Sequence, residues 1–221
     1  IMALTKFNFN SFDVTTAASK GLGFNASANA FATIDSTAVV LIKTLTASSS
    51  GDLSFVNGSS DVVLDGTYPV YRFVYSQIHA QTEGAAFQFN MSVDGGSNYN
   101  VEKTSTFFEA LHNEGGSAQG LNTESGEDLA QGTGFQNIVK NFGNGNDECA
   151  SGFLYLFSPS STSQVKQFIS ESSGHHQSDY NLHDFCAGYG NTTSAVNAVQ
   201  FKMSSGNVDS GIIKLYGIKD S

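Results

Sequence analysis

Residues 198–218 read AVQFKMSSGNVDSGIIKLYGI, and this stretch shows the fold most clearly. From Val199 to Met203 apolar and polar residues alternate, which is the two-residue period of a strand with one buried face. A polar turn follows at residues 204–210, and a second strand is expected over residues 211–218. Two strands joined by a short turn predict an antiparallel hairpin, and this hairpin is expected to close the sheet.

Similar segments recur along the chain. Further strands are expected over residues 37–46, 52–56, 61–64, 70–79, 85–93, 106–111, 151–158, 164–170 and 180–189. The segments 52–56 and 61–64 are expected to pair as a hairpin around Asn57 and Gly58, a favoured turn dipeptide. About ten strands at such spacings are typical of a sandwich or jelly roll. The predicted fold is all-β, an antiparallel β-sandwich or jelly roll with an extended N-terminal arm.

Two of these strands allow their faces to be assigned. Over residues 70–79 both faces are partly apolar, which predicts a central strand, with Arg72 and Ile78 on the same face. Over residues 85–93 the apolar side chains are expected to point inward and the polar ones outward: Phe87, Phe89, Met91 and Val93 against Gln88, Asn90 and Ser92. The chain has 18 phenylalanines, which we expect to fill the space between two sheets.

No shift in composition marks a second domain. Residues 1–32 predict an N-terminal arm, and residues 33–221 predict a single β-sandwich domain. The arm fits two roles, an element that packs on a neighbouring subunit or a terminal strand of the same domain. Residues 113–134 predict a long loop, which is either functional or partly disordered. Residues 135–142 fit either a short helix or a strand.

The composition narrows the classes of partner. The chain has 221 residues and a formal net charge of −10, and Arg72 is its only arginine. Nucleic acid is not an expected partner, because phosphate backbones are bound by clustered Lys and Arg. Membrane insertion is not expected, because no window reaches the roughly 18 apolar residues of a membrane span. The opening IMALTKFNFNSF lacks a continuous apolar run, so no secretory signal is expected. Because Ile1 precedes Met2, Met2 is the expected translational start.

The sequence contains no catalytic motif that we can identify. G-x-S-x-G, a phosphate-binding loop and a dinucleotide fingerprint are absent, and no pair of carboxylates is identified for glycoside cleavage. We therefore expect no enzyme, no catalytic or cofactor-binding residue and no cofactor. Cys149 and Cys186 could form one bridge, but two buried free thiols are favoured in a chain without an export signal.

Metal-ligating residue types gather once in the sequence. His175, His176, Asp179 and His183 could approach an ion from a polar loop expected at residues 172–179. Adjacent residues of an extended chain point to opposite sides, so His175 and His176 are poor co-ligands. Solvated loop histidines are favoured, and no metal site is expected.

Two acidic stretches invite a functional interpretation. Asp94 precedes Gly95 and Gly96, but the run lacks the alternating ligands and closing Glu of a calcium loop, so a tight hairpin is favoured. A second acidic cluster is expected to lie on a solvated surface: Glu124, Glu127 and Asp128.

Several longer phrases together resemble virion structural proteins of tailed phages, cyanophages and marine phages in particular. They are VYRFVYSQIHAQTEGAAFQFNMSVDGGSNYN (70–100), KTSTFFEALHNE (103–114), LYLFSPSSTSQVKQFIS (154–170) and AGYGNTTSAVNAVQFKMSSGNVDSGIIKLYGI (187–218). The most specific part is SSGNVDSGIIKLYGI (204–218), and the opening MALTKFNF (2–9) is also similar. Such proteins are described as virion structural, tail-fibre or capsid-decoration proteins, often with a jelly-roll-like domain.

The resemblance implies a non-enzymatic structural protein on the particle surface, a capsid decoration or fibre protein that acts by protein–protein assembly. It implies contacts with other capsid or tail proteins, a homo-oligomer such as a trimer, and a location in the virion after assembly in the host cytoplasm. The alternative is a tail-fibre or tail-tip module that binds a host surface glycan through residues 94–100 and 112–134. Three tyrosines could stack on sugar rings, although packing at strand ends is favoured for them: Tyr99, Tyr180 and Tyr189.

Overall fold

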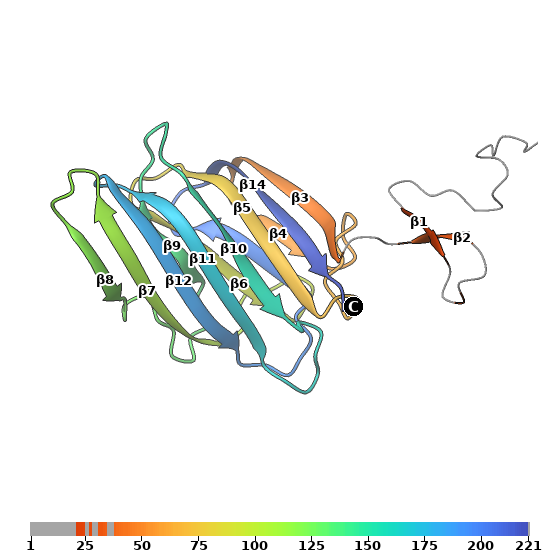
Figure 1. The fold of residues 1–221 in the computed structure, drawn as a ribbon. Coiled ribbons are helices and arrows are strands. Elements are labelled where there is room, and N and C mark those ends of the chain that lie inside the picture. The colour runs from red at the N-terminus through yellow and green to blue at the C-terminus, as the bar shows by residue number, and fades with distance from the viewer. Residues whose placement is uncertain (1–20, 25–26, 28–30, 35–37, 221) are drawn as a thin grey trace, which may run out of the picture. The chain divides into compact units, whose positions relative to one another are not determined.

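The computed structural model describes residues 21–24, 27, 31–34 and 38–220 (Figure 1). The larger of two compact units covers Val39–Asp220. In the smaller unit, β1 (Gly21–Phe24) pairs antiparallel with β2 (Phe31–Ile34). Most of the expected arm, residues 1–32, lies outside the described residues, so its role in attachment stays a prediction.

The larger unit contains one twelve-stranded antiparallel sheet that is folded into two layers. The front sheet, the broad face toward the viewer in Figure 1, has the order β3 (Val39–Ser50), β14 (Val208–Ile218), β5 (Val70–Ala80), β10 (Ala150–Phe157), β11 (Lys166–His176), β12 (Tyr180–Gly190), β7 (Lys103–Asn113), β8 (Gln119–Thr123). The back sheet has the order β9 (Gln136–Phe142), β6 (Ala85–Ser92), β13 (Ala198–Met203), β4 (Leu53–Val56). The two sheets are joined where His176 of β11 pairs with Phe142 of β9.

Eight of the strands follow the jelly-roll order. Taken as first to eighth along the chain, they are β3, β4, β5, β6, β9, β10, β13 and β14. The first, eighth, third and sixth lie side by side in the front sheet, and the second, seventh, fourth and fifth in the back sheet, as in two Greek keys. The hairpins β7–β8 and β11–β12 are insertions that widen the front sheet. The predicted all-β jelly-roll sandwich is therefore confirmed.

The C-terminal stretch does not form the expected hairpin. β13 pairs with β6 and β4 in the back sheet, whereas β14 pairs with β3 and β5 in the front sheet. The turn between them crosses from one layer to the other. Both strands have the predicted alternation, because Phe201 and Ile213 are fully buried from opposite sides of the same core. Alternation reports the buried face of a strand but not its partner.

Phenylalanine fills the space between the sheets, as predicted. The Phe201 ring of β13 lies 5.3 Å from the ring of Phe73 on the front sheet, and 6.3 Å and 5.7 Å from the rings of Phe55 and Phe87 on the back sheet. All four side chains are fully buried. Burying each one contributes about 2–3 kcal/mol.

A bulge in β5 overturns one predicted face. Ile78 was expected on the same face as Arg72, but Ile78 is fully buried while Arg72 is half-buried. Gln77 has φ 52°, and the register against β14 shifts between Ser210 and Ile212. The extra residue turns Ile78 into the core.

Asn90 and Ser92 of β6 are buried, not outward as expected, and Val93 is 38% exposed. Irregular chain covers this side of the strand, and Asn90 Nδ2 donates to the carbonyl oxygens of Tyr99 and Thr133 at 2.7 and 3.0 Å. A loop can bury a polar side chain when it supplies hydrogen-bond partners.

Two further segments differ from the structure predicted from the sequence, and for a third the structure selects one of two predicted options. Residues 61–64 are not a strand, because the Asn57 side chain accepts a hydrogen bond from the Leu64 amide and holds a loop, while β4 pairs with β13. Residues 172–176 belong to β11 rather than to a polar loop. Of the two options for residues 135–142, the strand is correct.

Candidate functional site

The outward-facing side chains of the front sheet, here called the outer face, are rich in apolar groups. One row pairs in register across six strands: Leu41, Tyr216, Arg72, Tyr155, Ile169 and Ala187. The adjacent row is Lys214, Val74, Phe153, Glu171, Phe185 and Phe108. Leu41, Ile169 and Phe108 are 51%, 48% and 39% exposed. The solvated side of an antiparallel sheet is normally polar, so this face differs from the usual pattern.

The aromatic residues on the outer face are held by one another. The Phe108 and Phe185 rings stack with centroids 4.7 Å apart and an angle of 8° between their planes. The Arg72 guanidinium lies over two rings, 5.9 Å from the centroid of Tyr155 and 5.3 Å from that of Tyr216. Such contacts limit side-chain freedom before any partner arrives, which lowers the entropy cost of binding.

A groove of about 360 Å³ lies on the outer face over β11 and β12. Phe157, Ile169 and Tyr189 contribute apolar walls, and Gln167 contributes an amide. An aromatic ring beside a hydrogen-bonding amide is chemistry that suits a sugar ring. Tyr189, one of the three candidate tyrosines, thus lines a groove on the outer face.

The other two candidate tyrosines pack within the chain. Tyr99 is half-buried, and its hydroxyl occupies the space where a Cβ on Gly96 would lie. The Tyr180 ring packs edge-on against the His176 ring with centroids 5.6 Å apart. Tyr180 at the start of β12 thus packs at a strand end, although it also lines a pocket, whereas Tyr99 packs within the loop between β6 and β7.

Residues 94–100, one of the loops expected to read a glycan, form a turn closed by Asp94. Its carboxylate accepts hydrogen bonds from the Ser92 hydroxyl, the Asn98 amide and the Asn98 side chain at 2.7–2.9 Å. Hydrogen bonds from Asn98 and Ser92 hold the pKa of Asp94 at about 2. Both carboxylate oxygens are engaged by the turn itself. The turn does not close the expected hairpin, because β6 pairs with β13 and β9 whereas β7 pairs with β12 and β8.

The acidic cluster at residues 124–128 is not simply solvated, contrary to the expectation. Glu124 Oε2 lies 2.7 Å from Lys140 Nζ, and Asp128 Oδ1 accepts a hydrogen bond from the Phe107 amide at 2.6 Å. Glu127 accepts a short hydrogen bond from Asn137. These acids hold the loop after β8 against β7 and β9. The sequence could not show this, because the acids lie 10–21 residues away from their partners on β7 and β9.

Charged groups also lie beneath the front sheet. Glu109 of β7 and Asp184 of β12 are register partners, 3% and 1% exposed, and Lys140 Nζ of β9 lies 3.2 Å from Glu109 Oε2. Burial raises the pKa of Asp184 to about 7, although the Lys140 amide donates to its Oδ2 at 3.1 Å. Glu109 and Lys140 line a pocket of about 410 Å³ that also includes His176 and other side chains. Lys140 is shared by Glu109 and Glu124, so its charge is neutralised within the chain.

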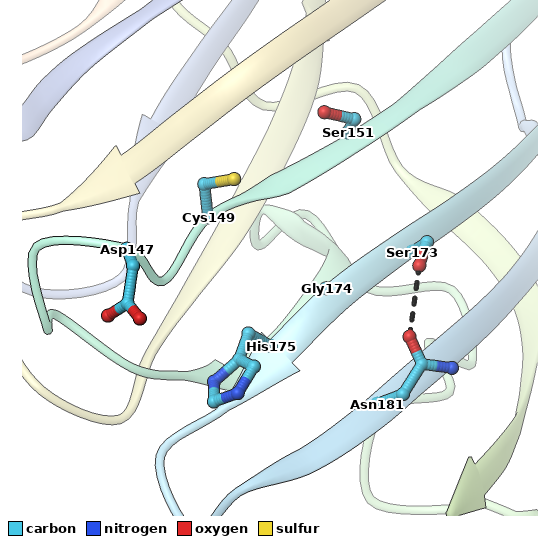
Figure 2. A pocket seen from close by; sticks show the side chains of 7 residues that line it. All are labelled: Asp147, Cys149, Ser151, Ser173, Gly174, His175 and Asn181. Carbon is cyan, nitrogen blue, oxygen red and sulfur yellow. Dashed lines mark hydrogen bonds between the residues drawn. The ribbon is translucent and has the colours of Figure 1, made fainter.

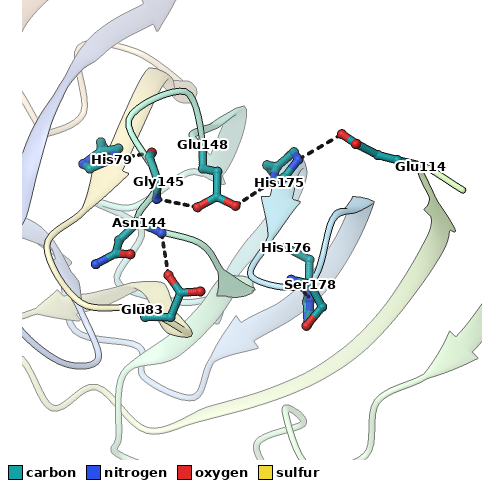
Figure 3. A network of polar contacts seen from close by, with 9 residues as sticks. All are labelled: His79, Glu83, Glu114, Asn144, Gly145, Glu148, His175, His176 and Ser178. Atoms are coloured by element: carbon teal, nitrogen blue, oxygen red, sulfur yellow. Dashed lines mark hydrogen bonds and ion pairs between the residues drawn. The ribbon is translucent and has the colours of Figure 1, made fainter.

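The structure separates three of the histidines that the sequence groups together. His175 Nδ1 lies 3.0 Å from Glu148 Oε1, and His175 Nε2 lies 3.3 Å from Glu114 Oε1 (Figure 3). His176 points to the other side of β11, as expected for neighbours in a strand, and His183 pairs with Glu171 at 2.8 Å. Glu114 and Glu148 come from the β7–β8 turn and the loop before β10, and no sequence pattern marks them as neighbours of His175.

Cys149 and His175 line a pocket of about 320 Å³ with Asp147 and Asn181 (Figure 2). In Figure 2 the Cys149 thiol does not point at the His175 ring, whose Nδ1 is engaged by Glu148. Cys149 and Cys186 are both free, as expected, but only Cys186 is buried and Cys149 is half-buried. Burial strongly raises the pKa of the Cys186 thiol, which keeps it protonated.

No protein-family model, curated protein or solved structure matches this chain. Among the residues that the structure describes, no helix is long and apolar enough to cross a membrane. The functional interpretation therefore depends on the residues themselves.

Proposed function

We propose that this chain is a structural protein of a tailed-phage particle, a capsid decoration or fibre protein that works by assembly with copies of itself and other particle proteins. It carries out no reaction in this proposal. Its place is the particle surface, where a net charge of −10 keeps it away from packaged DNA.

The outer face is the observation that supports the proposal best. Exposed Leu41, Ile169 and Phe108 lie in two rows that run across most of the front sheet. Contiguous apolar surface of this kind marks interaction sites, because leaving it in water is unfavourable. The resemblance of several phrases to phage virion proteins supports the setting in which such a surface would be covered.

Sedimentation velocity of the purified protein tests the assembly claim. The wild type is expected to form a discrete oligomer, and Ile169→Glu is expected to sediment as a monomer, because a charge on the outer face would be buried without a partner. Val93→Glu is the matched control, since Val93 is 38% exposed but lies off the front sheet. A wild type that stays monomeric at high concentration would contradict the proposal, as would an Ile169→Glu variant that still assembles.

Recognition of a host surface glycan is the second candidate, and the groove at Phe157, Gln167 and Tyr189 favours it. The binding surface would then be on strands rather than on the loops expected from the sequence. Binding on a glycan array that is lost in Tyr189→Ala would support this candidate. An array without hits for the assembled protein would count against it.

A further inference from the structure

A cluster of metal-ligating side chains lies at one end of the sandwich. The candidate ligand atoms of Glu148, His175 and Asp179 all lie within 4.8 Å of one another. They come from the loop before β10, from β11 and from the turn between β11 and β12. His175 is 31% exposed and Glu148 14% exposed at the side chain, so the cluster is open enough for an ion to enter.

The spacing is close to that of ligands around one ion. A tetrahedral Zn²⁺ with ligands at about 2.0–2.1 Å holds its donor atoms about 3.3–3.5 Å apart. His175 Nδ1 and Glu148 Oε1 are already 3.0 Å apart. Small rotations of exposed Asp179 would bring the third donor into range.

The other ring nitrogen of His175 is also engaged. His175 Nε2 lies 3.3 Å from Glu114 Oε1, as Figure 3 shows. Histidines that bind metals typically donate their second N–H to a carboxylate, which fixes the tautomer and the ring orientation. Glu114 would play this part if His175 binds the ion through Nδ1.

A second, independent observation concerns the space around Glu148. A Cβ placed on Gly143 would collide with the Glu148 carboxylate, and a Cβ on Gly145 would lie 2.8 Å from Glu148 Oε2. The Gly145 amide donates a short hydrogen bond to that same oxygen. Two glycines and a backbone amide thus aim the other oxygen, Oε1, at His175.

We propose that Glu148, His175 and Asp179 bind one divalent transition-metal ion, with Glu114 orienting His175. One imidazole with two carboxylates fits Zn²⁺ better than Ca²⁺ or Mg²⁺, which take oxygen ligands only. The fourth position would be filled by water. The ion would tie together these three segments, two of which also meet through the backbone hydrogen bond from the His175 amide to the Cys149 carbonyl oxygen at 3.2 Å.

Isothermal titration with Zn²⁺ after treatment with a chelator tests the site. The wild type is expected to bind one Zn²⁺ per chain, and its melting temperature is expected to rise by about 5 °C in saturating zinc. Asp179→Asn is expected to weaken binding at least about tenfold, and His175→Ala to abolish it. Asn tolerates the left-handed φ of 61° at position 179, so the fold should survive this variant.

Asp61→Asn is the matched control, because Asp61 is also exposed and has φ 67°. It should bind zinc as the wild type does. Equal zinc affinity in Asp179→Asn and the wild type would overturn the proposal, as would no binding at all. X-ray absorption at the zinc edge adds a check on the donors: a Zn–S distance of about 2.3 Å would assign the ion to a cysteine such as Cys149 instead.

Discussion

Asp184 is a carboxylic acid in an environment that is unusual for its residue type. It is 1% exposed, and its Oδ1 has no hydrogen-bond partner among the described residues. Burial raises its pKa from 3.8 to about 7, and the neighbouring Glu109 charge acts in the same direction. The folded protein therefore favours the protonated form of a side chain that the unfolded chain ionises near pH 4.

This shift predicts how stability depends on pH. Because the folded pKa is raised, the native state binds a proton that the unfolded state releases between pH 3.8 and about 7, so stability falls as the pH rises through this window. Asp184→Asn removes the charge and is expected to increase the free energy of unfolding at pH 8 by roughly 2–4 kcal/mol. At pH 4 the two proteins should differ by less than about 1 kcal/mol. Urea titrations at both pH values measure this, and a variant that is less stable than the wild type at pH 8 would contradict it.

Predictions about single residues were correct where the structure depends only on neighbouring residues in the chain. Opposite orientations of His175 and His176 follow from strand geometry alone. Glu148 and Glu114 could not be predicted as neighbours of His175, because they are 27 and 61 residues away from it in the chain.

The burial of Lys103 was also not predicted from the sequence. Its side chain is fully buried, and Nζ donates hydrogen bonds to Asn90 Oδ1 at 2.5 Å and to the Val101 carbonyl oxygen at 2.7 Å.

At the scale of elements, the pairing of β5 with β14 is interrupted by a β-bulge next to a glycine with positive φ. Gly211 has φ +122°, and a Cβ there would lie 2.7 Å from the Gln77 carbonyl oxygen. Gln77 itself has φ 52° and begins the bulge that turns Ile78 inward. The glycine lets the two central strands approach each other across the bulge.

Gly211→Ala is therefore expected to be strongly destabilising. The new Cβ meets backbone atoms that cannot move aside, so we expect a loss of about 3 kcal/mol or more in the free energy of unfolding. Gly95→Ala shares the positive φ, at 71°, but has nothing within 4 Å of its Cβ, and should lose only about 1 kcal/mol. Thermal or chemical denaturation compares the two variants, and equal losses would contradict the role given to the bulge.

The positions of most strands could be predicted, whereas the pairing of some could not. Alternation is a property of a few consecutive residues, so the core positions of Phe201 and Ile213 follow from sequence. Pairing depends on contacts far apart in the chain, which is why β13 and β14 separate into different sheets. The hairpin expected around Asn57 does not form for the same reason, because β4 pairs with β13, which is far away in the chain.

At the scale of the whole molecule, the two inserted hairpins, β7–β8 and β11–β12, determine the width of the front sheet. The jelly roll alone would have a four-stranded front sheet, whereas β11, β12, β7 and β8 extend it to eight strands. This extension carries Ile169, Phe185 and Phe108 and thus much of the apolar outer face. Nothing in the sequence separates these outward side chains from core ones, because both kinds of position carry large apolar residues.

The assembly proposal is tested most directly by a cryo-electron microscopy reconstruction of the purified phage particle. It is expected to contain density for this jelly roll on the particle surface, with the outer face around Tyr155 and Ile169 covered by a neighbouring subunit. Density only at the tail would rule out a capsid decoration protein. A particle that lacks the chain, or one in which the outer face is left open to solvent, would contradict the account.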